Sequence, residues 1–361
     1  MLTIGIVGAG GFIGCRTSEV FHHQTVAKVR PIVRTLPTIG ILNQLGVRTY
    51  TADAENLFSL KLALAGCDVV VHCTSGSPWS IRRTAEITYK AANQVGVKRL
   101  VYLSTASVHG QAPPSYTNEQ TALCDHQFYA YNNAKVQAER LLLRLRHQGD
   151  TEVVIVRPGI VTGPGSFWVV GFINALLANT AYLGNSGRGI CNSIYIDNLV
   201  EAIRLAATIP GIDQQAFLVG DRETVTWADL YRPLANALGF NLEQLPNFDC
   251  FNYQPSVGER LREKLRNSML VNRTSFFTLN HLKSSKPPAQ PCQPALNYEM
   301  AMLYSCCYKL PHHKAQQVLG YEPIVPFTEG CDRTLTWLAM KGYPLKSKKV
   351  IEVGSPSWGA A

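Results

Sequence analysis

The chain has 361 residues, and its 34 Lys and Arg residues against 25 Asp and Glu residues give a formal net charge of +9. Hydrophobic residues make up 46% and charged residues only 16%, which excludes disordered, collagen-like and low-complexity chains. The length suits one large domain or two smaller ones. No apolar run of about 18 residues occurs, so we expect no membrane span. The N-terminal segment is typical of a first core strand rather than a signal peptide.

Cysteine and histidine spacing predicts no metal site and no disulfide framework. The ten cysteines show no metal-ligand spacing, and the pairs His22-His23 and His312-His313 have no third ligand in register. Cysteines in apolar segments behave as small hydrophobic residues, so we expect a reducing, cytoplasmic location.

The basic residues are scattered along the chain, which argues against nucleic-acid binding. The densest group, from Arg260 to Arg266, falls in a predicted amphipathic helix with an apolar face for packing. A phosphate- or membrane-facing patch is the alternative interpretation. The apolar positions of this helix are Val257, Leu261, Leu265 and Met269.

From residue 1 to about 160, short apolar segments alternate with segments of helical periodicity. Continuous Val- and Ile-rich runs are typical of strands buried on both faces, and strand–helix–strand alternation predicts crossovers onto a parallel sheet. The predicted fold class is α/β, a Rossmann-like doubly wound parallel sheet. The predicted strands are Thr3–Gly8, Val26–Val33, Val47–Tyr50, Asp68–Cys73, Arg99–Ser104 and Glu152–Arg157, and the helices are Glu55–Ala65, Ile81–Val95 and Tyr131–Arg146.

Residues 161–343 are expected to form mainly a smaller substrate-binding lobe at the carboxyl edge of the sheet. Its first elements are a helix over Phe167–Ala178, a Gly-rich loop, and a strand over Ser193–Ile196. A helix follows with Asp197 as its N-cap, and a strand over Gln215–Val219 returns to the sheet. Residues from about 190 to 220 therefore contribute strands to the first domain.

The last third of the chain has fewer regular patterns. Thr226 and Asp229 form a capping-box-like start to a helix that ends at Gly239. Residues 240–325 are expected to be irregular, with a proline cluster typical of a loop or lid. Residues 344–361 are expected to form a solvated basic tail.

The segment from Gly8 to Gly14 directly follows the first predicted strand and opens a helix. Glycines permit a tight turn and close approach of the backbone to a pyrophosphate, which the helix N-terminus then faces. We therefore predict a dinucleotide site rather than an incidental turn. Its expected residues are Gly8, Gly11, Phe12, Ile13 and Gly14.

Two side chains bear on which dinucleotide binds. Arg34 follows the second strand, where NAD sites usually carry an acid for the ribose and where an Arg accommodates the 2′-phosphate of NADP. NADP(H) is therefore expected over NAD(H), with an ordinary surface Arg as the alternative. Asp53, beside Ala54, follows the third strand and is placed to accept from the adenine amino group or to cap a helix.

A hydroxyl, a phenol and an amine form the predicted catalytic set. Thr105 closes the fifth strand, and Tyr131 and Lys135 follow on a helix. Tyrosine is a poor base at its ordinary pKa of about 10, but a lysine four residues on lies on the same helix face and stabilises the phenolate. Thr105 can hold a substrate oxygen while Tyr131 gives or takes its proton.

The sequence contains Asp68-Val-Val-Val-His72, the segment from Val97 to Thr105, Tyr131-Asn-Asn-Ala-Lys135 with Glu139, Arg157-Pro-Gly, Tyr195-Ile-Asp197-Asn198 and Lys314 to Tyr321. Together these motifs resemble the extended short-chain dehydrogenase/reductase family of NAD-dependent epimerases and dehydratases. Its 3β-hydroxysteroid dehydrogenase and dihydroflavonol reductase branch is the most similar. The resemblance covers most of the chain but not residues 240–310.

The resemblance implies that Thr105, Tyr131 and Lys135 are catalytic, and that Ser104 is only a neighbour. It also implies that the stretch from Pro158 to Val161 lies against the nicotinamide. The remaining expected cofactor contacts are Thr74, Pro158, Gly159 and Val161.

Several residues depart from the family's motifs, and these departures narrow the set of activities that we expect. Ala106 and Ser107 replace the acid and base of dehydratases, and Cys191 replaces the Arg with which many epimerases hold a nucleotide-sugar pyrophosphate. Arg188 lies three residues away in the Gly-rich loop. His109 stands where the family usually has a Tyr. We expect it to be a packed histidine or part of the substrate wall, with a proton relay as the alternative.

We therefore expect an oxidoreductase that interconverts a ketone and a secondary alcohol on a small-molecule substrate. Nucleotide-sugar epimerization and non-catalytic dinucleotide sensing are the alternatives. The resemblance also implies a homodimer. The expected substrate contacts are Ser107, His109, Phe167, Trp168 and Arg188, and Phe172 and Tyr182 offer further aromatic surface for the pocket or the core.

Overall fold

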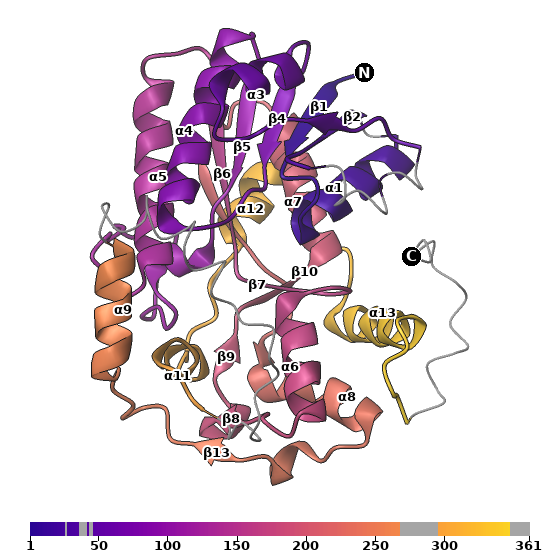
Figure 1. Ribbon diagram of the computed structural model, residues 1–361, viewed down its shortest axis with the longest axis vertical. Helices are drawn as coiled ribbons and strands as arrows, with labels where there is room; N and C mark the ends of the chain where they lie inside the picture. The colour runs from indigo at the N-terminus through magenta and orange to yellow at the C-terminus, as the bar shows by residue number, and fades with distance from the viewer. Residues whose placement is uncertain (26, 36–41, 43–45, 268–294, 347–361) are drawn as a thin grey trace.

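The computed structural model describes residues 1–25, 27–35, 42, 46–267 and 295–346. Its large sheet contains β1 (Thr3–Val7), β2 (Lys28–Val33), β3 (Tyr50–Thr51), β4 (Val69–His72), β5 (Arg99–Leu103), β6 (Glu152–Pro158) and β11 (Ala216–Val219). The strand order is β11-β6-β5-β4-β1-β2-β3, and all neighbouring strands are parallel (Figure 1). The order changes direction between β1 and β4, as in Rossmann-like sheets. The predicted fold class is confirmed.

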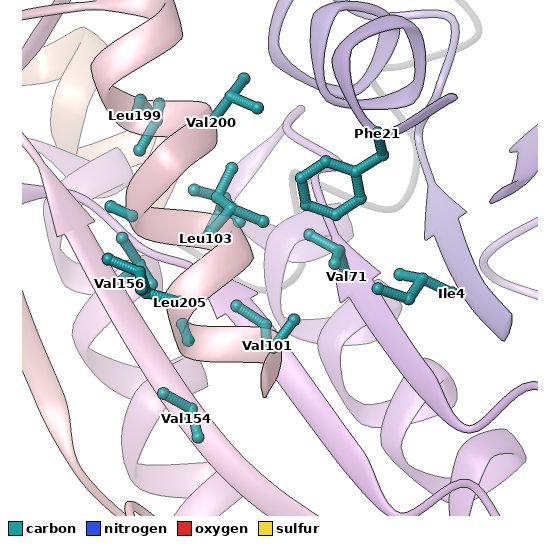
Figure 2. Packing of buried hydrophobic residues seen from close by; sticks show 14 of the residues in the cluster. Ile4, Phe21, Val71, Val101, Leu103, Val154, Val156, Leu199, Val200 and Leu205 are labelled. Carbon is teal, nitrogen blue, oxygen red and sulfur yellow. The ribbon is translucent and has the colours of Figure 1, made fainter. Parts of the chain in front are cut away.

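Helices cover both faces of this sheet. One face packs on α3 (Leu57–Leu64), α4 (Pro78–Gln94) and α5 (Ala130–Arg146), and the other on α1 (Phe12–His23), α7 (Ile196–Thr208) and α12 (His313–Leu319). Figure 2 shows the second face, where Phe21 of α1 lies near Val71 and where Leu199 of α7 lies over the sheet. Each fully buried side chain of this kind contributes about 1.5–3 kcal/mol, so the core fixes the strand ends that carry the site.

The C-terminal lobe lies below the sheet in Figure 1. It contains a second core in which the Trp227 indole is fully buried and donates a hydrogen bond to the Leu303 carbonyl at 3.1 Å. The predicted capping box is present, because the Thr226 and Asp229 side chains each accept from the other's backbone amide. The lobe helices are α6 (Phe167–Leu177), α8 (Trp227–Leu238), α11 (Tyr298–Tyr304) and α13 (Phe327–Met340).

Short strand pairs and single turns complete the described fold. The pairs are β7 (Ile160–Thr162) with β10 (Ser193–Tyr195), β8 (Leu183–Gly184) with β13 (Asn247–Phe248), and β9 (Ile190–Cys191) with β12 (Val225–Thr226). The 3₁₀ turns are η2 (Ala106–His109), η3 (Asn185–Gly187) and η4 (Leu242–Gln244). No helix among the described residues has the length and apolar character needed to cross a membrane.

The predicted N-cap of α7 is wrong. Tyr195 occupies the N-cap, and Asp197 lies in the first turn of the helix. Its carboxylate pairs with Arg16 at 2.6 Å and with Arg333 at 3.1 Å. Two guanidinium groups thus take the oxygens that were expected to accept from helix amides.

The prediction that residues 240–325 are irregular is also wrong for the described part. Its helices α11 and α12 were not predicted, whereas α9 (Val257–Asn267) confirms the helix expected around Arg260 to Arg266. Helix α9 has its apolar positions outward, since Val257, Leu261 and Leu265 are 83%, 58% and 47% exposed while Glu263 is buried. Met269, the proline cluster and most of the basic tail lie outside the described residues.

Candidate active site

A cleft of about 910 Å³ runs along the carboxyl ends of the parallel strands. This is the edge at which open α/β sheets bind ligands. The turns after β1, β2, β3, β4, β5 and β6 all contribute to its lining. The predicted cofactor residues that line it are Gly8, Gly11, Phe12, Ile13, Arg34, Asp53, Ala54, Thr74, Tyr131, Pro158, Gly159 and Val161.

The glycine turn leaves the start of α1 open to this cleft. Gly8 has φ of +88°, and a Cβ there would lie 3.1 Å from the Cys73 backbone. Helix α1 begins after Gly11, with no side-chain cap and no acidic residue in its first turn. Gly14 lies underneath rather than in the lining, where a Cβ would meet the Gly8 carbonyl at 2.4 Å. The uncapped amides at the start of α1, next to glycine backbone that carries no side chains, are suited to bind the pyrophosphate of a dinucleotide.

The residues expected around the adenosine half meet at the other end of the cleft. Arg34 is exposed at the end of β2. The N-cap of α3 is Asn56 rather than Asp53, whose carboxylate instead accepts from the Glu55 amide at 3.0 Å. The Thr74 hydroxyl lies 2.8 Å from Nε2 of the buried His72.

The three predicted catalytic residues converge where β5 and α5 meet. Thr105 and Tyr131 line the cleft, together with Ser107. The Thr105 hydroxyl accepts from the Ser107 amide at 3.2 Å. Lys135 lies one helical turn after Tyr131, is 3% exposed, and donates to the Leu103 carbonyl at 2.8 Å. Its Nζ is 6.0 Å from the centroid of the Tyr131 ring.

Burial shifts the pKa values of this pair in opposite senses. It raises the pKa of Tyr131 to about 12, with a further increase from Glu299, while a hydrogen bond with Thr105 lowers it. Burial lowers the pKa of Lys135 to about 8, opposed by the Glu139 carboxylate. At neutral pH the phenol therefore keeps its proton and most of the lysine is charged.

A buried ion pair lies beneath the catalytic set. Glu139 and Arg157 are 2% and 5% exposed and lie 2.6 Å apart, and Ser104 donates to the same carboxylate. His109 does not line the cleft, because its Nε2 lies 3.3 Å from Nη1 of Arg157. Burial, followed by Arg157, lowers the pKa of His109 to about 4. This geometry favours a packing role for His109 over a proton relay.

Of the residues expected at the substrate, Ser107, Phe167 and Trp168 line the cleft. Arg188 does not, since its Nε donates to the Asn185 carbonyl at 3.3 Å. Phe172 stacks on Tyr231 with ring centroids 3.7 Å apart, and Tyr182 packs in the lobe core.

Several cleft residues were not anticipated from the sequence, and Glu299 of α11 is the charged one that comes from the lobe. The available signal was Asn297, an N-cap residue type directly before a short helical pattern. Its side chain accepts from the Met300 amide at 2.9 Å and so starts the helix that carries Glu299.

Within the described parts of the chain, no group of three His, Cys, Asp or Glu side chains is placed to hold a metal ion. No two of the described cysteines form a disulfide.

Comparison with known proteins gives a family match and several relatives. The model of the NAD-dependent epimerase/dehydratase family matches residues 4–220. The chain is 24% identical to a 2-alkyl-3-oxoalkanoate reductase of Shewanella oneidensis, over 91% of this chain and 84% of the relative. It is 29% identical to a UDP-glucose 4-epimerase of Vibrio cholerae, over 68% and 78%. It is 23% identical to a decarboxylating sterol-4-alpha-carboxylate 3-dehydrogenase of Candida albicans, over 92% and 96%.

Proposed function

Because the chain belongs to the NAD-dependent epimerase/dehydratase family, within the extended short-chain dehydrogenases/reductases, we propose that it interconverts a ketone and a secondary alcohol. The observation that carries the proposal is the meeting of Thr105, Tyr131 and Lys135 beside the dinucleotide-type cleft. A protein that only bound a dinucleotide would have no need of a buried lysine beside a cleft tyrosine. In the direction of carbonyl reduction, Tyr131 begins with the proton that the carbonyl oxygen receives.

The proposed mechanism assigns one task to each side chain. The bound nicotinamide cofactor supplies the hydride. Thr105 and Tyr131 hold the carbonyl oxygen by hydrogen bonds, and the Tyr131 O–H bond breaks as its proton passes to that oxygen. The charged Lys135 stabilises the phenolate that remains, which then recovers a proton from solvent. Pro158, Gly159 and Val161 form the wall proposed to face the nicotinamide.

Charge around the cleft favours reduction with NADP(H) over epimerization of a nucleotide sugar. Arg34 is the one cation that lines the cleft among the described residues, and it lies at the end proposed for the adenosine ribose. A nucleotide-sugar diphosphate would need cations on the substrate side. Cys191 is buried and does not line the cleft, and the Arg188 side chain donates to the Asn185 carbonyl instead.

Tyr131→Phe tests the proposed proton donor. We expect turnover of NADPH with a carbonyl substrate to fall at least about a hundredfold, while the Kd for NADPH changes little, because only the phenolic proton is lost. Tyr116→Phe is the matched control, since Tyr116 is 87% exposed and does not line the cleft. Unchanged turnover in Tyr131→Phe would remove the assignment.

A further inference from the structure

The substrate side of the cleft has an unusual charge distribution. The charged side chains that line the described cleft are Arg34, Asp53, Glu55 and Glu299. The first three belong to the turns after β2 and β3, at the adenosine end. Glu299 is the only one of these four that comes from the lobe. It lines the cleft together with Tyr131, Phe167 and Trp168. The space beside the catalytic hydroxyls is therefore walled by aromatic rings and one carboxylate.

Helix α11 is anchored firmly enough to fix this carboxylate. Ala301, Leu303 and Tyr304 of α11 are buried in the lobe core. At its first turn the Tyr298 amide donates to the Glu259 carboxylate of α9 at 2.9 Å. The Tyr298 ring also contacts Phe128, just before α5, with centroids 4.8 Å apart. These contacts hold the start of α11 against the start of α5, which carries Tyr131.

Glu299 lines the same cleft as Tyr131, so its charge acts at the reacting position. Its carboxylate raises the pKa of Tyr131, after the larger effect of burial. Burial raises the pKa of Glu299 itself, a hydrogen bond with Gln111 and the charge of Arg266 lower it, and Glu263 raises it. The Arg266 guanidinium acts on both carboxylates, because it also pairs with Glu263 at 2.8 Å. Glu263 and Arg266 thus offset one another, and Glu299 is the carboxylate of this group that lines the cleft.

We propose that Glu299 makes this site selective for uncharged ketones over ketones that carry a carboxylate or phosphate. The inference deepens the proposed function and rests on it. A substrate anion beside Glu299 meets a like charge at the cleft wall, with no cation in the described lining on that side to offset it. The oxoalkanoate class named for one relative is therefore not expected to transfer to this chain.

A matched pair of aryl ketones tests this selectivity. Methyl 4-acetylbenzoate and 4-acetylbenzoate share the ketone and the ring, and differ in one negative charge. Calorimetric titration of protein saturated with NADP⁺ measures the Kd of each probe without turnover. The variants are Glu299→Gln and, as control for net charge, Glu322→Gln, whose carboxylate is 61% exposed and outside the cleft.

We expect the wild type and Glu322→Gln to bind the ester at least about tenfold more tightly than the acid. In Glu299→Gln the difference should shrink to less than about threefold, because the acid binds more tightly. Equal affinities in the wild type, an unchanged ratio in Glu299→Gln, or no binding of either probe would overturn the inference.

A parallel assay with NADPH separates this inference from the proposed function. Selective binding of the ester with NADPH oxidation by the ester supports both. Selective binding without NADPH oxidation by either probe would support the role of Glu299 and count against carbonyl reduction.

Discussion

Burial gives Tyr131 and Lys135 protonation states that suit a reductase. The surrounding protein atoms disfavour the phenolate of Tyr131, which is still 38% exposed, and the ammonium of the buried Lys135. Burial raises the pKa of Tyr131 to about 12 and lowers that of Lys135 to about 8. The phenol therefore begins with the proton that carbonyl reduction consumes, and the lysine keeps most of its charge at pH 7. Glu299 strengthens the first effect and Glu139 opposes the second.

His72 provides a test of burial that does not depend on catalysis. It is fully buried at the end of β4, and burial, followed by Lys135, lowers its pKa from 6.5 to about 3. Between these two values the unfolded chain binds a proton that the folded chain does not, so the free energy of unfolding falls as the pH falls. From pH 7 to pH 5 this one group accounts for about 2 kcal/mol.

Urea unfolding of His72→Asn at pH 7 and pH 5 checks this prediction. The variant should lose about 2 kcal/mol of the pH dependence shown by the wild type. His126→Asn is the control, because the His126 side chain is 90% exposed, and its pH dependence should match the wild type. An unchanged pH dependence in His72→Asn would contradict the assigned burial.

At the scale of elements, α5 organises the site by helical periodicity. Tyr131, Lys135 and Glu139 follow at four-residue intervals and share one face. The first lines the cleft, the second is buried beside it, and the third pairs with Arg157 of β6. Breaking such a buried pair typically costs about 3–5 kcal/mol, so this pair ties α5 to the sheet.

Helix α9 packs on α5 through a polar contact instead of its apolar face. The buried Glu263 accepts from the Ala130 amide at 3.1 Å, at the start of α5, where the N-cap residue Tyr129 offers no side-chain cap. The Asn133 side chain likewise donates to Asn267 at 3.1 Å. The hydrogen bond between the Ala130 amide, which has no partner within α5, and the Glu263 carboxylate thus determines which face of α9 turns toward α5.

Two substitutions in α9 distinguish packing on α5 through Glu263 from packing through the apolar face. Glu263→Ala should lower the free energy of unfolding by about 1–2 kcal/mol, because it removes the cap of α5. Leu261→Ser should change it by less than about 0.5 kcal/mol, since Leu261 is 58% exposed. Urea unfolding measures both. The reverse order of effects would mean that the apolar face is the buried one, as periodicity alone predicts.

For the whole molecule, the sequence was informative where patterns are local. The Gly8 turn, the apolar strands and the Tyr131–Lys135 spacing each lie within one short segment, and they sufficed to predict the sheet and the meeting of Thr105, Tyr131 and Lys135. Glu299 and Glu263 could not be placed this way. Their positions depend on contacts with α5, more than a hundred residues earlier. Hydrophobic periodicity gives no information on such polar contacts between distant segments.

The charge of the whole chain and the charge of its cleft have opposite signs. The net charge is +9, yet the described cleft lining has three acidic side chains and the single base Arg34. Net charge therefore does not indicate the ligand here. We propose that Arg34 binds the cofactor's 2′-phosphate and that the substrate side takes an uncharged ketone.

The most direct test of the central claim is a fluorescence titration of the purified protein with NADPH and with NADH, together with a check for cofactor already bound. We expect exchangeable NADPH, bound at least about tenfold more tightly than NADH, and loss of that preference in Arg34→Ala. NAD that co-purifies and does not exchange would contradict this expectation. That result would point to an epimerase, which oxidises and re-reduces the same carbon without net consumption of cofactor.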